Sequence, residues 1–247
     1  MPPHEPLPKR VAENAHEAAS EAAQHVKERV HEIREEVKPH LRGWLHAATT
    51  PLALAAGVVL IVLSPTLTTR VGSAVFAGTA LLLFTVSAIY HRGTGRWSPR
   101  TVAFLRRFDH SNIFLLIAGS YTPFTLILLD PPQRDVLLAI VWGGAIAGAT
   151  FRTFWSNAPR WVYTPIYVAL GWVSIFYVDD FAGGGTAVIT LIAVGGGLYT
   201  LGGLVYGFKK PDPFPTWFGF HEVFHTFTIA AFVCHYVAAS IATYQLR

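Results

Sequence analysis

The sequence predicts an all-α membrane protein, a bundle of seven transmembrane helices with the N-terminus inside the cell. Hydrophobic residues make up 52% of its 247 residues and charged residues only 14%, well below the quarter or so that is usual in soluble globular domains. Seven runs of about 20 mostly apolar residues are each long enough to cross the hydrocarbon core of a bilayer. The runs cover residues 45–64, 71–91, 109–129, 136–154, 161–178, 186–206 and 221–244.

The charges between these runs predict the orientation. If the spans alternate in direction, positive residues gather on one side and are sparse on the other. The rich side has Arg92, Arg96, Arg100, Arg106, Arg107, Arg152, Arg160, Lys209 and Lys210, and the other has Arg70, Arg134 and the terminal Arg247. Positive loops stay in the cytoplasm during insertion. We therefore expect a multi-pass protein of the plasma or inner cell membrane, with its N-terminus cytoplasmic and its C-terminus outside.

The chain divides into a polar tail, residues 1–43, and a seven-transmembrane domain, residues 44–247. The tail has no charged-then-apolar secretory signal, so the first span is expected to act as its own insertion signal. Within residues 11–37, apolar residues recur at spacings of three and four, which predicts a cytoplasmic amphipathic helix. This helix either lies on the membrane or packs against another copy of the chain, and a homo-oligomer formed through it stays an open alternative.

The residue types available limit the chemistry. Cys234 is the only cysteine, so an intrachain disulfide and a cysteine-rich metal site are both excluded. A metal ion would have to use His, Asp or Glu. The basic residues are accounted for by membrane orientation, so nucleic acid is not predicted as a partner; membrane lipids are.

Four ionisable residues are predicted to meet at one depth near the cytoplasmic face. His221 and His225 lie four residues apart at the start of the last span, on one face of a helix. His91 ends the second span and Asp109 begins the third. Since the second span runs inward while the third and seventh run outward, we predict that His91, His221 and His225 bind one metal ion. The alternative is three interfacial histidines bonded to backbone and water.

Three histidines leave a fourth coordination position open, which is typical of catalytic rather than structural zinc. Such an ion lowers the pKa of a bound water to around 7, and a nearby carboxylate can orient that water or take its proton. Asp109 is the candidate for this carboxylate. Ser87, one turn before His91, is predicted to contact the substrate or the surroundings of the ion.

Three further histidines are harder to assign. His235 lies ten residues beyond His225, about 15 Å deeper along a straight helix, so it is predicted not to join the same ion. His46, at the start of the first span, has the depth to lie beside the site but is equally compatible with an ordinary boundary residue. The role of His110 stays open.

These residues resemble the hemolysin III family, within the superfamily of progestin and adipoQ receptors (adiponectin receptor-like proteins). The resemblance covers the chain from about residue 40 to the end. It rests on Ser87-x3-His91, on Phe108-Asp109-His110 leading to Ala118-Gly119-Ser120-Tyr121-Thr122-Pro123-Phe124, and on His221-x3-His225 followed by His235.

The resemblance implies zinc held by His91, His221 and His225, with Asp109 near the water that the zinc activates. It also implies an amidohydrolase of membrane lipids, similar to alkaline ceramidases and linked to membrane homeostasis. Two alternatives are a non-enzymatic membrane sensor or regulator with structural zinc, and a hemolysin-type cytolytic protein, which follows from the family name alone. The chain departs from the family before His46, where Lys38, Pro39 and Arg42 stand in place of a Glu and an Asn.

Overall fold

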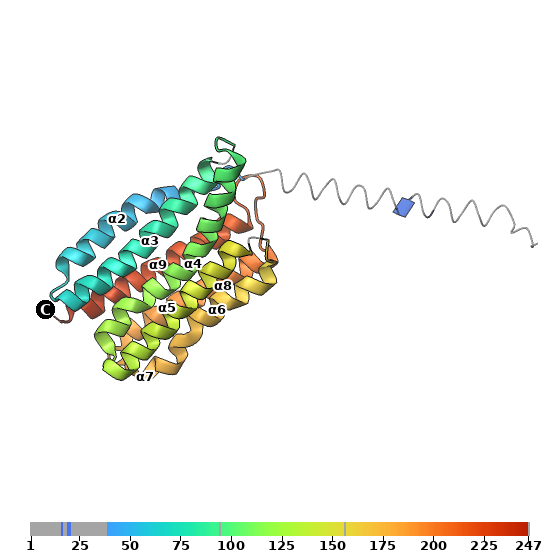
Figure 1. The fold of residues 1–247 in the computed structure, drawn as a ribbon. Helices are drawn as coiled ribbons and strands as arrows, with labels where there is room; N and C mark the ends of the chain where they lie inside the picture. Colours follow the sequence, from blue (N-terminus) through green and yellow to red (C-terminus); the bar gives the residue numbers. More distant parts are fainter. Residues whose placement is uncertain (1–15, 17–18, 21–38, 94, 156, 247) are drawn as a thin grey trace, which may run out of the picture. The chain divides into compact units, whose positions relative to one another are not determined.

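The computed structural model describes residues 16, 19–20, 39–93, 95–155 and 157–246. Seven helical segments within them are long and apolar enough to cross a membrane, which confirms the predicted class (Figure 1). The predicted amphipathic helix over residues 11–37 falls almost entirely outside the described residues and stays a prediction. The segments are α2 (Trp44–Leu63), α3 (Leu67–Gly93), α4 (Pro99–Leu128), α5 (Pro131–Phe154), α6 with η1 and α7 (Arg160–Ala182), α8 (Thr186–Phe208) and α9 (Phe220–Tyr244).

The third span begins ten residues before the predicted apolar run. Ser98 caps α4 by accepting a hydrogen bond from the Thr101 amide, and Pro99 occupies the first helical position, where its missing N–H costs nothing. The helix therefore has 30 residues and is about 45 Å long. As a result, Asp109 lies almost three turns inside α4 rather than at its start.

The fifth span is not one continuous α-helix. It consists of α6 (Arg160–Gly171), the 3₁₀ segment η1 (Trp172–Tyr177) and the short helix α7 (Val178–Ala182). At the change of pitch, the Tyr121 hydroxyl of α4 lies 2.5 Å from the Gly171 carbonyl oxygen and accepts from the Ser174 amide at 2.8 Å. Tyr121 thus satisfies backbone groups that an uninterrupted helix would have paired internally.

Helices that follow one another in the chain run in opposite directions, and α9 lies among α2, α3, α4 and α8 (Figure 1). The start of α2, the end of α3, the start of α4 and the start of α9 therefore share one end of the bundle. Small residues allow close packing nearby: a Cβ added at Gly148 of α5 would overlap the ring of Phe114 on α4. This arrangement brings four helix ends, from separate stretches of sequence, to one end of the bundle.

Candidate metal centre and cavity

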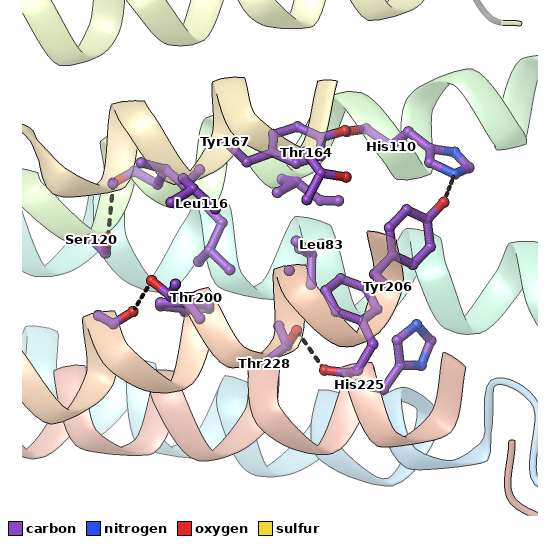
Figure 2. A pocket seen from close by; sticks show the side chains of 18 of the residues that line it. Leu83, His110, Leu116, Ser120, Thr164, Tyr167, Thr200, Tyr206, His225 and Thr228 are labelled. Atoms are coloured by element: carbon purple, nitrogen blue, oxygen red, sulfur yellow. Dashed lines mark hydrogen bonds between the residues drawn. The ribbon is translucent and has the colours of Figure 1, made fainter. Parts of the chain in front are cut away.

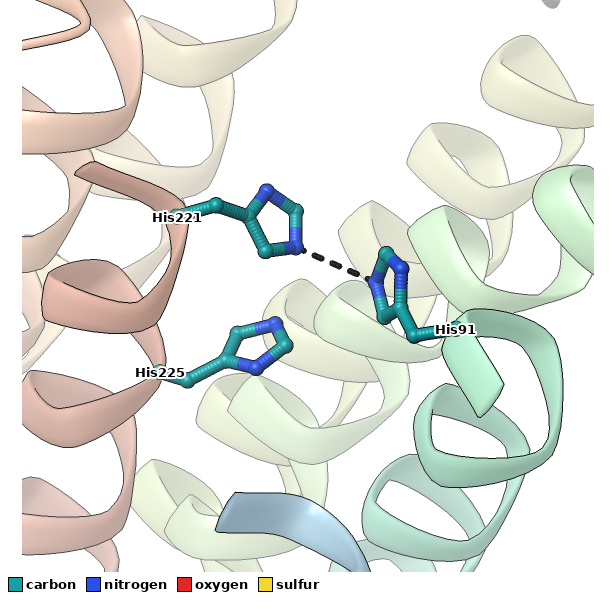
Figure 3. Close-up of side chains that lie close together, drawn as sticks. All are labelled: His91, His221 and His225. Atoms are coloured by element: carbon teal, nitrogen blue, oxygen red, sulfur yellow. Dashed lines mark hydrogen bonds between the residues drawn. The ribbon is translucent and has the colours of Figure 1, made fainter. Parts of the chain in front are cut away.

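Three histidines from two helices meet at this end of the bundle. His91 lies in the last turn of α3, and His221 and His225 lie one turn apart at the start of α9. One ligand atom from each lies within 4.8 Å of the other two, a grouping unique among the His, Cys, Asp and Glu side chains that the structure describes. The Nε2 atoms of His91 and His221 are 3.1 Å apart, and the His225 ring faces the same space (Figure 3).

The spacing of the three histidines is close to that needed to hold a metal ion, and zinc provides the comparison. Tetrahedral zinc with Zn–N distances of 2.0–2.1 Å separates its nitrogen ligands by about 3.3 Å. The His91–His221 pair already has almost this separation, and the 4.8 Å limit leaves about 1.5 Å of inward movement for the third ring. Without a cation, one of the two facing Nε2 atoms must carry a proton to donate to the other. With a cation, both present a lone pair to it.

Asp109 lies beside this histidine group. Its Oδ2 atom is 3.7 Å from His91 Nε2, and its carboxylate accepts a hydrogen bond from the Ser87 hydroxyl. Ser87 is buried one turn before His91 on α3. The two predicted catalytic residues therefore contact each other, and Ser87 orients the carboxylate.

The first turn of α9 is held by two carboxylates. Glu222 Oε2 accepts from the Gly219 amide at 3.0 Å, and Asp212 Oδ1 accepts from the Phe220 amide at 2.9 Å. These bonds satisfy donors that the start of a helix leaves open and suit its positive dipole end. The other oxygen of the fully buried Glu222 lies 2.5 Å from Arg42 Nε. The capping fixes the turn that carries His221.

The first span also reaches the site, which the sequence had left open. The buried His46 ring stacks on the His225 ring with centroids 3.8 Å apart and planes 14° from parallel. The edge of His46 meets Phe84 of α3. Hydropathy gave the depth of His46 but could not show that α2 and α9 are neighbours, so its place beside His225 is a finding of the structure.

His235 lies outside the histidine group, deeper along α9. Its Nε2 donates weakly to the Ile192 carbonyl oxygen at 3.4 Å, and its ring packs edge-on against Phe124 and Tyr199. A Cβ at Gly195 of α8 would overlap the ring, so the close approach of α8 depends on that glycine.

His110 faces a separate polar cluster. Its Nδ1 donates to the Arg106 carbonyl oxygen at 2.6 Å, and its Nε2 accepts from the Tyr206 hydroxyl at 3.1 Å (Figure 2). Tyr206 in turn lies 3.2 Å from the hydroxyl of Tyr163. Sequence reasoning missed this cluster because its members come from α4, α6 and α8.

A cavity extends from the histidine group into the bundle between α4, α6, α8 and α9 (Figure 2). It offers about 110 Å³ to the centres of water-sized molecules. His46, Ser87, Asp109, His221 and His225 line one part of it, and His235 and Thr200 line a deeper part. Apolar side chains form much of the wall between them, among them Leu83, Ile113, Leu116, Ile117 and Phe224.

Comparison with known proteins identifies the family. The family model described as haemolysin-III related matches residues 35–236, which contain the histidine group, Asp109 and the cavity. This chain belongs to the haemolysin-III-related family.

Similar proteins with hemolysin-3 names agree with this assignment. The chain is 34% identical over 165 residues to a hemolysin-3 homolog of Bacillus subtilis, covering 65% of this chain and 73% of the relative. It is 31% identical over 191 residues to hemolysin-3 of Bacillus cereus, covering 74% and 82%. A progestin and adipoQ receptor-like protein 1 of Caenorhabditis elegans is 28% identical over 193 residues, covering 70% of this chain and 43% of that protein. The last match is consistent with membership of the family in the wider progestin and adipoQ receptor superfamily.

Proposed function

We propose that this protein is a zinc-dependent hydrolase of lipid amides or esters. The observation that carries the proposal is the cavity, because two of the three grouped histidines, His221 and His225, line it together with Asp109 and a largely apolar interior. A hydrolase of this class needs a bound cation, a proton acceptor and room for the reacting bond within a few ångströms. Here three histidines that could hold the cation, a carboxylate and the cavity lie at one end of the bundle.

The residues have complementary roles in this proposal. His91, His221 and His225 hold the ion, and a zinc ion held in this way polarises a carbonyl oxygen and makes water a stronger nucleophile at neutral pH. As water adds to the carbonyl carbon, Asp109 takes its proton and returns it to the leaving nitrogen or oxygen when the bond to carbon breaks. The hydrogen bond from Ser87 keeps the Asp109 carboxylate turned toward the reacting atoms.

The walls of the cavity favour a lipid substrate. Leucine, isoleucine and phenylalanine side chains adjoin the polar end, so the cavity suits a molecule with an apolar part next to a polar linkage. Lipid amides and lipid esters have this form. If the N-terminus is cytoplasmic, as the basic loops predict, the linkage is cleaved near the cytoplasmic leaflet of the cell membrane.

A second candidate is a membrane sensor or regulator in which the ion only joins helices. The observation in its favour is that the three histidines bridge α3 and α9, two helices far apart in the chain. A metal ion there contributes folding energy whether or not any chemistry follows. The two candidates differ in what they require of Asp109.

The test uses purified protein in detergent or lipid nanodiscs. We expect about one zinc ion per chain, its loss in His221→Ala, and its retention in His235→Ala, which removes another buried histidine from the same helix. Absence of bound zinc from the wild type, or equal zinc in both variants, would overturn the metal site.

Asp109→Asn then separates the two candidates. Hydrolase function predicts that this variant keeps its zinc but loses release of fatty acid from a panel of lipid amides and esters by a factor of about 10² or more. The sensor would be favoured by two results together. The wild-type protein would bind zinc but cleave none of the panel, and cells carrying Asp109→Asn would have an unchanged lipid profile.

A further inference from the structure

A short segment at the entrance to α2 contacts both helices that carry the three histidines. We call residues 41–46 the α2 entry segment. Its contacts are the Leu41 amide with the Trp217 carbonyl oxygen at 3.2 Å, Arg42 with Glu222, Gly43 with His91, and His46 with His225. These residues are about 175 to 180 positions from their partners in and just before α9 and about 50 from His91, so the contacts are tertiary rather than local.

Gly43 allows the segment to lie against the end of α3. Its φ of +80° is a left-handed conformation that favours glycine. A Cβ built on it would lie 2.8 Å from the Cβ of His91 and 3.1 Å from the Cγ of Arg92. The backbone of the segment therefore packs directly on a metal-binding residue, with no side chain between them.

Burying His46 would be energetically unfavourable if its ring only filled space. It is 2% exposed, and neither ring nitrogen has a hydrogen-bond partner in the part of the chain that the structure describes. Burying an imidazole without hydrogen bonds costs free energy that a leucine or phenylalanine would not. What the ring does contribute is a flat face lying almost parallel to the ring of His225. That contact restricts the rotation of the His225 side chain.

Arg42 acts on the same helix through Glu222. Glu222 lies between the two α9 histidines in sequence, and its carboxylate joins Arg42 to the Gly219 amide at the helix start. Because the carboxylate is almost completely buried while Arg42 keeps 21% of its side chain exposed, the arginine supplies the charge that makes this burial tolerable. The position of the first α9 turn, and with it His221, depends on Arg42.

We propose that the α2 entry segment positions the metal ligands and sets the affinity of the centre for its ion, with His46 and Arg42 as positioning residues. This inference rests on the proposed metal centre and adds to it a third helix that supplies no ligand. Residues that orient metal ligands influence metal affinity strongly, and their replacement typically lowers it about 10- to 100-fold.

The experiment measures zinc affinity by competition with a fluorescent zinc chelator on detergent-purified protein. His46→Leu keeps the volume roughly constant but removes the flat face, whereas His46→Phe keeps a ring and also removes both nitrogens. We expect about 10- to 100-fold weaker binding in His46→Leu and near-wild-type binding in His46→Phe. His235→Leu is the matched control and should bind as the wild type does.

A second variant tests the other half of the segment without disturbing the core at His46. Arg42→Ala is expected to weaken zinc binding about tenfold, while Arg42→Lys, which keeps a cation, should lose less. Circular dichroism and size-exclusion profiles establish that each variant is folded. Cobalt substitution adds a spectroscopic readout, since a displaced His225 ring changes the visible absorption of the bound Co²⁺.

The outcomes separate this inference from the proposed function. A wild type that binds no zinc defeats the proposed metal centre. The positioning role is refuted, and the metal centre is not, if the wild type binds zinc but the His46→Leu and Arg42→Ala variants are unaffected. In that case both folded variants would keep the wild-type zinc affinity and cobalt spectrum. Equal losses in His46→Leu and His46→Phe would also overturn it, because they would show that the nitrogens of His46 are needed rather than its face.

Discussion

Replacing Arg42 by alanine removes the cation that faces a buried carboxylate. Glu222 has 1% of its side chain exposed, and Arg42 Nε lies 2.5 Å from its Oε1 atom. Removing one partner of a buried ion pair costs about 3–5 kcal/mol, mostly because the remaining charge stays buried. Since 21% of the Arg42 side chain is exposed, water can reach part of the gap, and we expect a loss of about 2–3 kcal/mol in the free energy of unfolding.

The matched measurement is a double-mutant cycle with Glu222→Gln. Glutamine keeps an oxygen that can accept from the Gly219 amide but carries no charge. Arg42→Ala combined with Glu222→Gln therefore removes both charges and retains the helix cap. We expect the double variant to be at least about 1 kcal/mol more stable than Arg42→Ala alone. Unfolding of detergent-solubilised protein, followed by circular dichroism, supplies the four free energies.

A nearby arginine provides the control. The exposed Arg92 lies with its guanidinium carbon 3.5 Å from the centre of the Trp44 ring, and an exposed cation–π contact contributes about 0.5–1 kcal/mol. Arg92→Ala should therefore cost clearly less than Arg42→Ala. If Arg42→Ala and the double variant unfold within about 0.5 kcal/mol of each other, the buried charge does not explain the role of Arg42 and the reasoning fails.

Three further outcomes test the local geometry. Gly43→Ala should destabilise the protein by more than Gly95→Ala, because both glycines have positive φ but only Gly43 abuts His91; thermal unfolding should separate them by about 1 kcal/mol or more. Gly195→Ala should displace His235 and cost about 1–3 kcal/mol, with zinc content by mass spectrometry unchanged. In a solution holding zinc at 100 times its dissociation constant, bound zinc should raise the unfolding free energy of the wild type by about 2.7 kcal/mol, and a chelator should remove this gain. Equal melting curves with and without the chelator would contradict the metal centre.

Hydropathy located the seven spans but not all of their ends. The apolar run that begins at residue 109 predicts the part of α4 suited to hydrocarbon, whereas the helix itself begins at Pro99. Helical hydrogen bonding continues through Arg100, Arg106 and Arg107 because it depends on the backbone and the cap rather than on apolar side chains. Ser98 followed by proline is a start signal that could have predicted this extension.

The histidine group was predictable because it depends on depth and on spacing within one helix. His221 and His225 share a face by the helical repeat, and alternating spans bring His91 to the same depth. The contacts of the α2 entry segment depend instead on which helices are neighbours and how each is rotated about its axis. Neither is encoded in the spacing of apolar residues, so the His46–His225 stack and the Arg42–Glu222 pair required the structure.

The cavity bears on the choice between a catalytic and a purely structural ion. An unfilled cavity costs about 24 cal/mol for each cubic ångström, so 110 Å³ would cost roughly 2–3 kcal/mol if it were left empty. An ion that only joined α3 to α9 would need no such space beside it, and larger side chains in the wall would make the bundle more stable. Retaining space that reaches Asp109 and the histidines is understandable if a substrate or other ligand occupies it. The cost of the cavity therefore favours a site that binds a ligand over an ion that only joins the two helices.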